Sequence, residues 1–558
     1  MSTEEKHAII NSESPPLKEE HGKIYWFFTH LRHRARAYIK AHIKALILSA
    51  LATLIILFVL RAAIQPYVIA VRTHVIMFLV PIGVTFLFFW LLKQSQGLIK
   101  KSVLTVLYIA LAMTTLRWGE AVHTYISLYA RYRSLDIIEM AHLPTTENER
   151  IHPLNSIHSL AYMAMSETEA PSLPYFVRIG NEHRWVAAIE PVYFLPRLTN
   201  GVKGLFNVSA TGPYPSFSQE DRVHVHFDTG DNLLLGRNSG TATIKTFGIW
   251  RYLNYEPKDV TYLKDDSGQW VQVISLVRWK GFLFPQPESG GLQIIRQNKK
   301  STIFTDLKRT FFGSGEWIPP NKISSHPYLV GQNILAQQVS RYIAESFRFQ
   351  EGFFGPMPGF HKGDTRIPDL PHDMNNPPFT TYFIDEGVPG SLYHYFALEP
   401  FDPDKQGLSV SVLVSSDGIP NSRGKPKVYA NRHHQKGESL IGASAIEAII
   451  RDKRKEYTWG KSNTLPVEHR PWIRLINGKL RFFWLTTIVT FKGEHDQQEQ
   501  KQPKRDRKDV RYIAGSVPEI VLTDGKYRTP VWVDPLTPHT WSEQLIKELG
   551  PMWKANER

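Results

Sequence analysis

The residues best suited to chemistry lie in one long loop, GPMPGFHKGDTRIPDLPHDMNNPP, at residues 355–378. Loops of this length inside a compact domain often have a function. Its side chains that could contact a ligand or partner, or bind a metal ion, are His361, Asp364, Asp369, His372 and Asp373. Because their spacing fits no established calcium loop, a structured linker is the simplest interpretation. Contact with a ligand or partner is the functional alternative, and a metal site is the least favoured.

A second candidate is the segment HVHFD, in which His224, His226 and Asp228 alternate with apolar residues. Alternate residues of a strand point to the same face. Two imidazoles and a carboxylate on one face could bind a metal ion. No further ligand is evident in the sequence, so a half-exposed polar strand face is the simpler interpretation.

The chain contains no cysteine. This excludes disulfides, thiol nucleophiles, cysteine-ligated zinc, iron–sulfur clusters and c-type haem. The segment WGKS at residues 459–462 ends like a phosphate-binding loop, but Lys455 stands where the first glycine of that motif is required. We therefore expect no cofactor.

The net charge is +14 and the isoelectric point about 9.5, which suggests an acidic partner or surface. The basic residues are scattered and are not interleaved with aromatic residues in one groove, so we do not expect nucleic acid as a partner. Many of them flank apolar segments instead. The charge is therefore that of an integral membrane protein.

Three apolar segments lie in the first 120 residues, at residues 45–60, 75–92 and 102–116, and none follows. Crossing a bilayer takes about 20 residues in a helix. The sequence thus predicts three transmembrane helices within residues 45–118, of which the third is the shortest. More than forty residues precede the first segment, which argues against a cleaved signal peptide.

The distribution of basic residues beside these segments predicts their orientation. Arg32, Arg34, Arg36, Lys40 and Lys44 precede the first segment, and Lys93, Lys100 and Lys101 lie between the second and third. The first loop holds only Arg61 and Arg72, although Arg117, Arg131 and Arg133 follow the third segment. The balance places residues 1–44 in the cytoplasm.

Three spans then place the bulk of the chain outside the cytoplasm. If the third segment does not span, the bulk is cytoplasmic instead. A large extracytoplasmic domain without disulfides is more natural in a bacterial cell membrane than in a eukaryotic secretory pathway.

The remainder of the chain shows an internal repeat. Four segments, at residues 174–191, 260–277, 381–400 and 471–489, each read as two strands joined by a turn that contains glycine. The last of them, PWIRLINGKLRFFWLTTIV, has Asn477-Gly478 between apolar runs, which is a strong hairpin signal. A third strand follows each hairpin, beginning near Gly204, Gly290, Gly407 and Ala514.

A segment of helical periodicity precedes three of the four hairpins. Pro153 opens the segment before the first hairpin. The stripe Leu335, Val339, Ile343, Phe347 lies before the third hairpin, and Ile446, Ile449, Ile450 lie before the fourth. The second hairpin is preceded only by the short TFGIWRYL. One helix packed on an antiparallel meander buries its own core. In shape alone, with no family motif, this unit resembles cystatin-like and PepSY-like domains.

The predicted organisation is an N-terminal three-helix transmembrane region followed by about four α+β units. Its parts are a basic cytoplasmic segment 1–44, the transmembrane helices 45–118, an amphipathic connector 119–150, units at 151–235, 236–320, 321–435 and 436–535, and a C-terminal helix within 536–558. The fourth unit carries a charged insertion at 493–509. Thr540 with Glu543 opens the last helix, and Gly550-Pro551 is expected to end it.

Two functions remain open. The first is a membrane-anchored, non-enzymatic scaffold or binding protein with a protein partner or a second copy of itself. The second is a metal-dependent enzyme or ligand binder that uses the 355–378 loop. An enzyme should bring the Asp and His of that loop together in a concave site.

Overall fold

The computed structural model describes most of the chain between residues 43 and 557. The residues outside this description are 1–42, 44, 46, 50, 213–221, 249, 299–302, 358–360, 362, 371–377, 386–387, 403, 406, 434–438, 456–458, 460–463, 493–511, 514–517 and 558. The charged insertion and nearly all of the predicted basic segment fall among them. The chain forms two compact units, Met1–Ile64 and Gln65–Arg558.

Two helices are long and apolar enough to cross a membrane, namely Ile47–Thr73 and α2 (Val75–Gln94). Helix α3 (Leu98–Ser134) bends by 50° between residues 114 and 117. It supplies a third candidate if its two parts are one span. The first two predicted segments therefore lie in helices of suitable length and composition, and the third does so if the two parts of α3 form one span.

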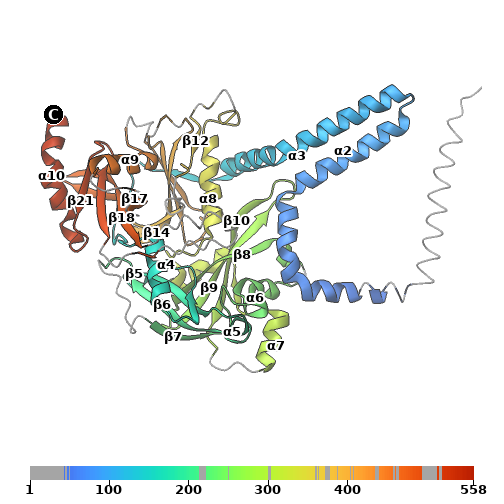
Figure 1. Ribbon diagram of the computed structural model, residues 1–558, viewed down its shortest axis with the longest axis horizontal. Helices are drawn as coiled ribbons and strands as arrows, with labels where there is room; N and C mark the ends of the chain where they lie inside the picture. Colours follow the sequence, from blue (N-terminus) through green and yellow to red (C-terminus); the bar gives the residue numbers. More distant parts are fainter. Residues whose placement is uncertain are drawn as a thin grey trace, which may run out of the picture. The chain divides into compact units, whose positions relative to one another are not determined.

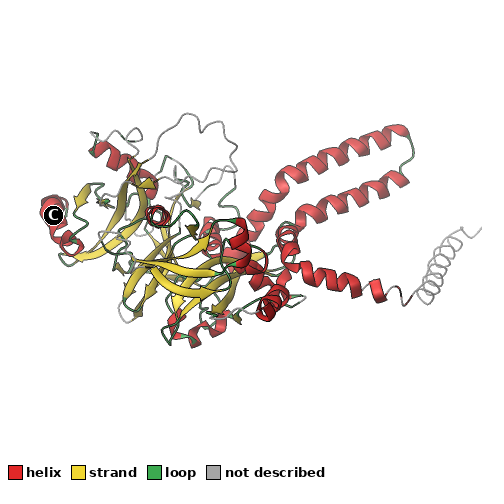
Figure 2. Cartoon of the chain, turned by 60° about the horizontal axis from the view of Figure 1, so that its bottom comes forward, coloured by secondary structure: helices red, strands yellow, loops and turns green. Residues whose placement is uncertain are grey.

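Helices α2 and α3 lie side by side as an antiparallel hairpin (Figure 1). The ring of Tyr108 stacks on Phe88 with 4.4 Å between centroids, and its hydroxyl is 2.9 Å from the hydroxyl of Thr85. The hairpin projects from the rest of its unit, and its tip is the short turn around Gly97 (Figure 2).

The C-terminal half of α3 leaves this hairpin and packs against residues 135–558, which form the body of the protein. Tyr125 meets the rings of Phe349 and Phe353 edge-on. Arg131 is buried and lies 3.5 Å from Glu288. One bent helix therefore joins the hairpin tip to the body.

The end of the first helix also contacts the body. The side-chain amide of Gln65 donates to the carbonyl of Tyr255 at 2.8 Å. Arg72 donates to the carbonyls of Trp279 and Gly281 at 3.1 and 3.0 Å. The residues just before α2 and the second half of α3 therefore lie at the same end of the hairpin.

The body is built on four sheets, which are antiparallel apart from one edge pair (Figures 1 and 2). The first has the order β3-β5-β6-β7, with β4 also beside β5. Its strands are β3 (Glu169–Pro171), β4 (Tyr175–Ile179), β5 (Glu182–Pro191), β6 (Val202–Ser209) and β7 (Arg222–Phe227). The short helix α5 (Phe194–Thr199) lies between β5 and β6.

The second sheet is a meander of order β11-β10-β9-β8. Its strands are β8 (Tyr255–Lys264), β9 (Trp270–Lys280), β10 (Gln286–Arg296) and β11 (Glu316–Ile318). Helix α6 (Ser239–Thr246) precedes it, and the Asn238 side chain caps that helix by accepting from the Thr241 amide. Helix α7 (Ile303–Phe312) lies between β10 and β11.

The third sheet has the order β1-β16-β15-β14-β13-β2, with β12 beside β14. Its strands are β1 (Ile137–Glu139), β2 (Thr145–Thr146), β12 (Thr365–Arg366), β13 (Phe379–Asp385), β14 (Val388–Pro400), β15 (Val410–Ser415) and β16 (Val428–Arg432). Strand β1 pairs with β16 in parallel. Helix α8 (Gln337–Ser346) comes before the hairpin β13–β14.

The fourth sheet has the order β17-β18-β20-β21, with β19 beside β18. Its strands are β17 (Thr464–Ile476), β18 (Lys479–Lys492), β19 (Tyr512–Ile513), β20 (Glu519–Asp524) and β21 (Pro530–Val533). Helix α9 (Ala443–Lys453) precedes it and α10 (Trp541–Asn556) follows it.

The four predicted hairpins and their third strands are confirmed. The hairpins are β4–β5, β8–β9, β13–β14 and β17–β18, and the third strands are β6, β10, β15 and β20. Asn477 and Gly478 both have positive φ, 51° and 74°, and join the pair Ile476–Lys479, as expected for a type I′ turn. Each meander also has a fourth strand: β7, β11, β16 and β21. Of these, only β7 was predicted to be a strand, from the HVHFD segment, and it was not assigned to the meander.

The helices pack on the sheets with the faces that their periodicity predicts. Ile157 of α4 (Leu154–Met163) lies in one core cluster with Trp185 of the first sheet. Two helices pack against more than one sheet. Helix α8 is clustered with the third sheet and with β9 of the second, and α9 with the third and fourth sheets. The opposite face of the first sheet shares a cluster with the second.

The predicted end of the last helix is wrong. Helix α10 continues through Gly550-Pro551 to Asn556, and the Thr540 side chain makes no capping hydrogen bond. Trp553 explains the extension, because it is buried and its indole donates to Asp524 at 3.0 Å. A buried tryptophan can outweigh the single backbone hydrogen bond that a proline removes.

Candidate functional site

The structure brings together two residues of the 355–378 loop. The His361 Nδ1 atom lies 3.2 Å from Oδ2 of Asp364, and the imidazole stacks on Phe401 with 4.0 Å between centroids. Arg348 lies 3.6 Å from the same carboxylate oxygen. The Asp364 side chain is fully buried. Burial raises the pKa of Asp364, although Arg348 and His361 oppose this shift.

The remaining residues of this loop are not part of that cluster. Asp369 is exposed, and His372 and Asp373 lie outside the described residues. The backbone beyond Asp364 forms β12, which pairs with the end of β14. Oδ1 of Asp364 is buried with no hydrogen-bond partner among the described residues. The cluster is thus a rigidly held carboxylate with one oxygen available to a donor or cation.

The HVHFD segment lies on β7 and just after it. His224 and His226 are exposed. Asp228 is engaged in an ion pair with Arg309 at 3.0 Å and accepts from Asn298 at 3.0 Å. The polar strand face therefore carries the two imidazoles, while the carboxylate makes contacts within the fold.

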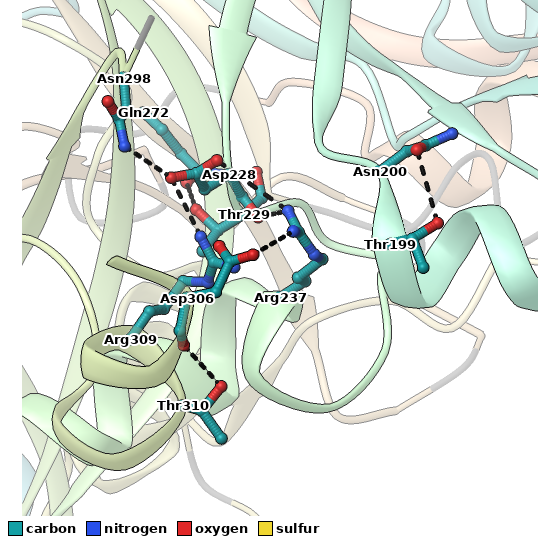
Figure 3. A network of polar contacts seen from close by, with 10 residues as sticks. All are labelled: Thr199, Asn200, Asp228, Thr229, Arg237, Gln272, Asn298, Asp306, Arg309 and Thr310. Atoms are coloured by element: carbon teal, nitrogen blue, oxygen red, sulfur yellow. Dashed lines mark hydrogen bonds and ion pairs between the residues drawn. The ribbon is translucent and has the colours of Figure 1, made fainter. Parts of the chain in front are cut away.

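Figure 3 shows the network around Asp228. Arg237 lies 3.9 Å from Asp228 and 3.3 Å from Asp306, and Arg309 also pairs with Asp306 at 2.6 Å. Two guanidinium groups thus alternate with two carboxylates. These ion pairs connect the end of β7 to α7 and to the turn that contains Arg237. The network therefore stabilises the fold.

A second charged network was not predicted and is more deeply buried. Arg150, Glu468 and Arg470 are each less than a tenth exposed. Arg150 lies 2.8 Å from Glu468, and Arg470 lies 3.8 Å from it. Arg470 also donates to the Thr487 hydroxyl at 2.9 Å. Burial, together with the charge of Arg150, lowers the pKa of Arg470 to about 9.

This network joins distant parts of the chain. Glu468 accepts from the Leu154 amide at 2.8 Å, and so supplies a negative charge to the N-terminus of α4. The Arg150 guanidinium lies 5.2 Å from the centre of the Trp185 ring. Sheet four, α4 and sheet one therefore meet at a single carboxylate.

The backbone at Glu468 is unusual. Its φ is +53°, and the β17–β18 register shifts between Val467 and Arg470. A positive φ outside glycine costs energy and is retained where the surroundings require it. The bulge directs the Glu468 side chain towards α4. It also explains how the charged triplet Glu468-His469-Arg470 fits inside an otherwise apolar strand.

A cavity of about 250 Å³ lies beside the network. Its polar walls include Arg150, Glu468, Asn333 and Gln337, and Pro378 at the end of the long loop also lines it. A larger cleft of about 460 Å³ opens near the β17–β18 turn, where Lys479 and Arg481 pair with Glu557. His361 and Asp364 line neither space.

Comparison with known proteins gives no relative: no family model, no curated protein and no solved structure matches the chain. Within the part of the chain that is described, no three His, Asp or Glu side chains are arranged to hold a metal ion. The site must be interpreted from its own geometry.

We expect Glu468→Gln to destabilise the protein strongly. Removing one partner from a buried ion pair typically costs about 3–5 kcal/mol, because the remaining charges stay buried. Thermal unfolding of the full-length protein in detergent measures the effect. Glu182→Gln is the matched control, since the Glu182–Arg184 pair is exposed and its loss should cost at most about 1 kcal/mol. Equal shifts in the two variants would contradict the assignment.

Proposed function

We propose that the protein is a membrane-anchored, non-enzymatic scaffold or binding protein of the bacterial cell membrane. Its N-terminal segment is cytoplasmic and its α+β body is extracytoplasmic. The proposal rests chiefly on α3, which runs from the apolar hairpin into the body and fixes the body beside the membrane. Of the candidate site residues, Asp228, His361 and Asp364 make contacts within the fold.

The orientation is supported by the hairpin geometry. The residues before α2 and the second half of α3 both contact the body, so α2 and α3 cross together or not at all. The tip then lies on the opposite side, and it carries Lys93, Lys100 and Lys101. Arg72 and Arg131, which face the body, are bound by carbonyls and by Glu288, so they count little as orienting charges. The positive-inside rule places the tip in the cytoplasm.

We also propose that the four sheets belong to copies of one helix-plus-meander unit, similar in shape to cystatin-like and PepSY-like domains. Each sheet contains four antiparallel strands in chain order, interrupted only by β19 in the fourth sheet, and α4, α6, α8 and α9 precede them in turn. Such a surface of repeated sheets is suited to binding protein.

The orientation predicts which engineered cysteines react from outside the cell. Since the chain has no cysteine, Gln96→Cys at the tip and Asp266→Cys in the β8–β9 turn each introduce a single thiol. In spheroplasts, which have lost the outer membrane but keep the cell membrane closed, a membrane-impermeant maleimide should label Asp266→Cys at once. It should label Gln96→Cys only after permeabilisation. The reverse pattern would place the body in the cytoplasm.

The scaffold proposal predicts reproducible intermolecular contacts of the body. Amine-reactive cross-linking of the full-length protein in native membranes, followed by mass spectrometry, should join the body to a second copy or to one other protein at constant positions. A body that yields only intramolecular cross-links under the same conditions would contradict a scaffold role.

The alternative is a metal-dependent enzyme or ligand binder, favoured by Oδ1 of buried Asp364, which has no hydrogen-bond partner among the described residues and lies on the carboxylate beside His361. It predicts that Zn²⁺ or Ca²⁺ raises the melting temperature of the wild-type protein, because a ligand that binds only the native state stabilises it. Asp364→Asn should abolish that rise, and Asp369→Asn, at an exposed position, should not. A melting temperature unaffected by either ion would remove the metal-dependent form of this alternative.

A further inference from the structure

The loop between β9 and β10 presents apolar side chains beside the membrane hairpin. Its sequence, at residues 279–285, is WKGFLFP. Phe282 is 72% exposed and Leu283 is 46% exposed. Arg278 and Lys280, at the end of β9, are exposed as well. A short loop with an apolar tip and basic flanks is the composition expected at a membrane surface.

The loop is fixed between the first helix and α3. Arg72 donates to the carbonyl of Gly281 at 3.0 Å. The ring of Phe284 stacks on His123 of α3, with 5.6 Å between centroids. Beyond the loop, the Gln286 side chain donates to the carbonyl of Ser127 at 3.2 Å. Figure 1 shows the end of the second sheet reaching the base of the hairpin. The depth of the loop is therefore tied to that of the hairpin.

The length of α2 determines this depth. Its apolar run, residues 75–92, extends about 27 Å at 1.5 Å per residue, while the hydrocarbon core is about 30 Å thick. The whole run is needed to cross, so Val75 lies at the boundary of the core. Arg72 lies three residues earlier, at the end of the preceding helix and separated from α2 by the turn at His74, so no more than about 10 Å of chain lies between it and that boundary. Gly281, which accepts from Arg72, lies at the same level.

We propose that the β9–β10 loop inserts Phe282 and Leu283 into the interfacial layer of the bilayer, with Arg278 and Lys280 at the level of the lipid phosphates. The partner is the lipid surface itself, because the loop continues the surface that the hairpin presents to lipid. The inference rests on the proposed membrane crossing of α2. It adds a second attachment, which would prevent the body from swinging about the hairpin.

The absence of native cysteine allows a direct test in the full-length protein. Phe282→Cys, labelled with an environment-sensitive fluorophore, is reconstituted into nanodiscs of mixed zwitterionic and anionic phospholipid. We expect blue-shifted emission, and quenching by lipids that carry a nitroxide near the headgroup. Leu283→Cys is the second variant should the first fold poorly. Leu536→Cys, at an exposed site beside α10, is the control and should show neither effect.

A label at Phe86→Cys, on the exposed surface of α2 and near the middle of its apolar run, separates the possible failures, and its quencher is a lipid that carries the nitroxide deep in the acyl chain. Quenching at residue 86 without quenching at residue 282 would overturn the loop proposal and leave the membrane anchor intact. No quenching at either position would overturn both. A blue shift at residue 282 that depends on protein concentration, without lipid quenching, would assign the loop to a second copy of the chain and contradict lipid contact.

Discussion

Helix α3 must satisfy two different surroundings along one continuous backbone, and much of the architecture follows from this requirement. Residues 102–116 in its first half are apolar, a composition suited to a lipid environment. Its second half carries Tyr125, Tyr129 and Arg131, which have partners only inside the body. Because both halves belong to one helix, the orientation of the hairpin and the position of the second and third sheets are coupled.

The interior of the body is held by helices and charges that several sheets share. Helix α8 lies against the third sheet and β9, and Glu468 connects the fourth sheet to α4. Each of these contacts stabilises two elements of the body together. They join the four sheets into one compact body. A buried ion pair adds little net stability, but it penalises wrong arrangements strongly.

The sequence predicted what depends on local chemistry. The hairpins were predictable because turn residues such as Asn477-Gly478 act within a few residues. The helices were predictable because apolar residues such as Ile157 and Ile343 belong to stripes with helical period. The fourth strands other than β7 were not predicted, since a strand such as β11, of three residues, is too short to show alternation. The end of α10 was mispredicted because Trp553 is held by Asp524, a contact across the fold. The same limit applies to the Arg150–Glu468–Arg470 network, in which Arg150 is more than 300 positions from its two partners. Its one local signal was the charged triplet inside an apolar strand.

The edge of the third sheet has a consequence for biosynthesis. Strand β1 pairs with β16, and the paired residues Ile137 and Val428 are about 290 positions apart. At 5–20 residues per second, a ribosome needs roughly 15–60 s to make the intervening chain. During that time β1, β2 and the polar half of α3 are present without the sheet that completes them. The third sheet can therefore be completed only after this interval, when the helical hairpin of α2 and α3 has long been synthesised.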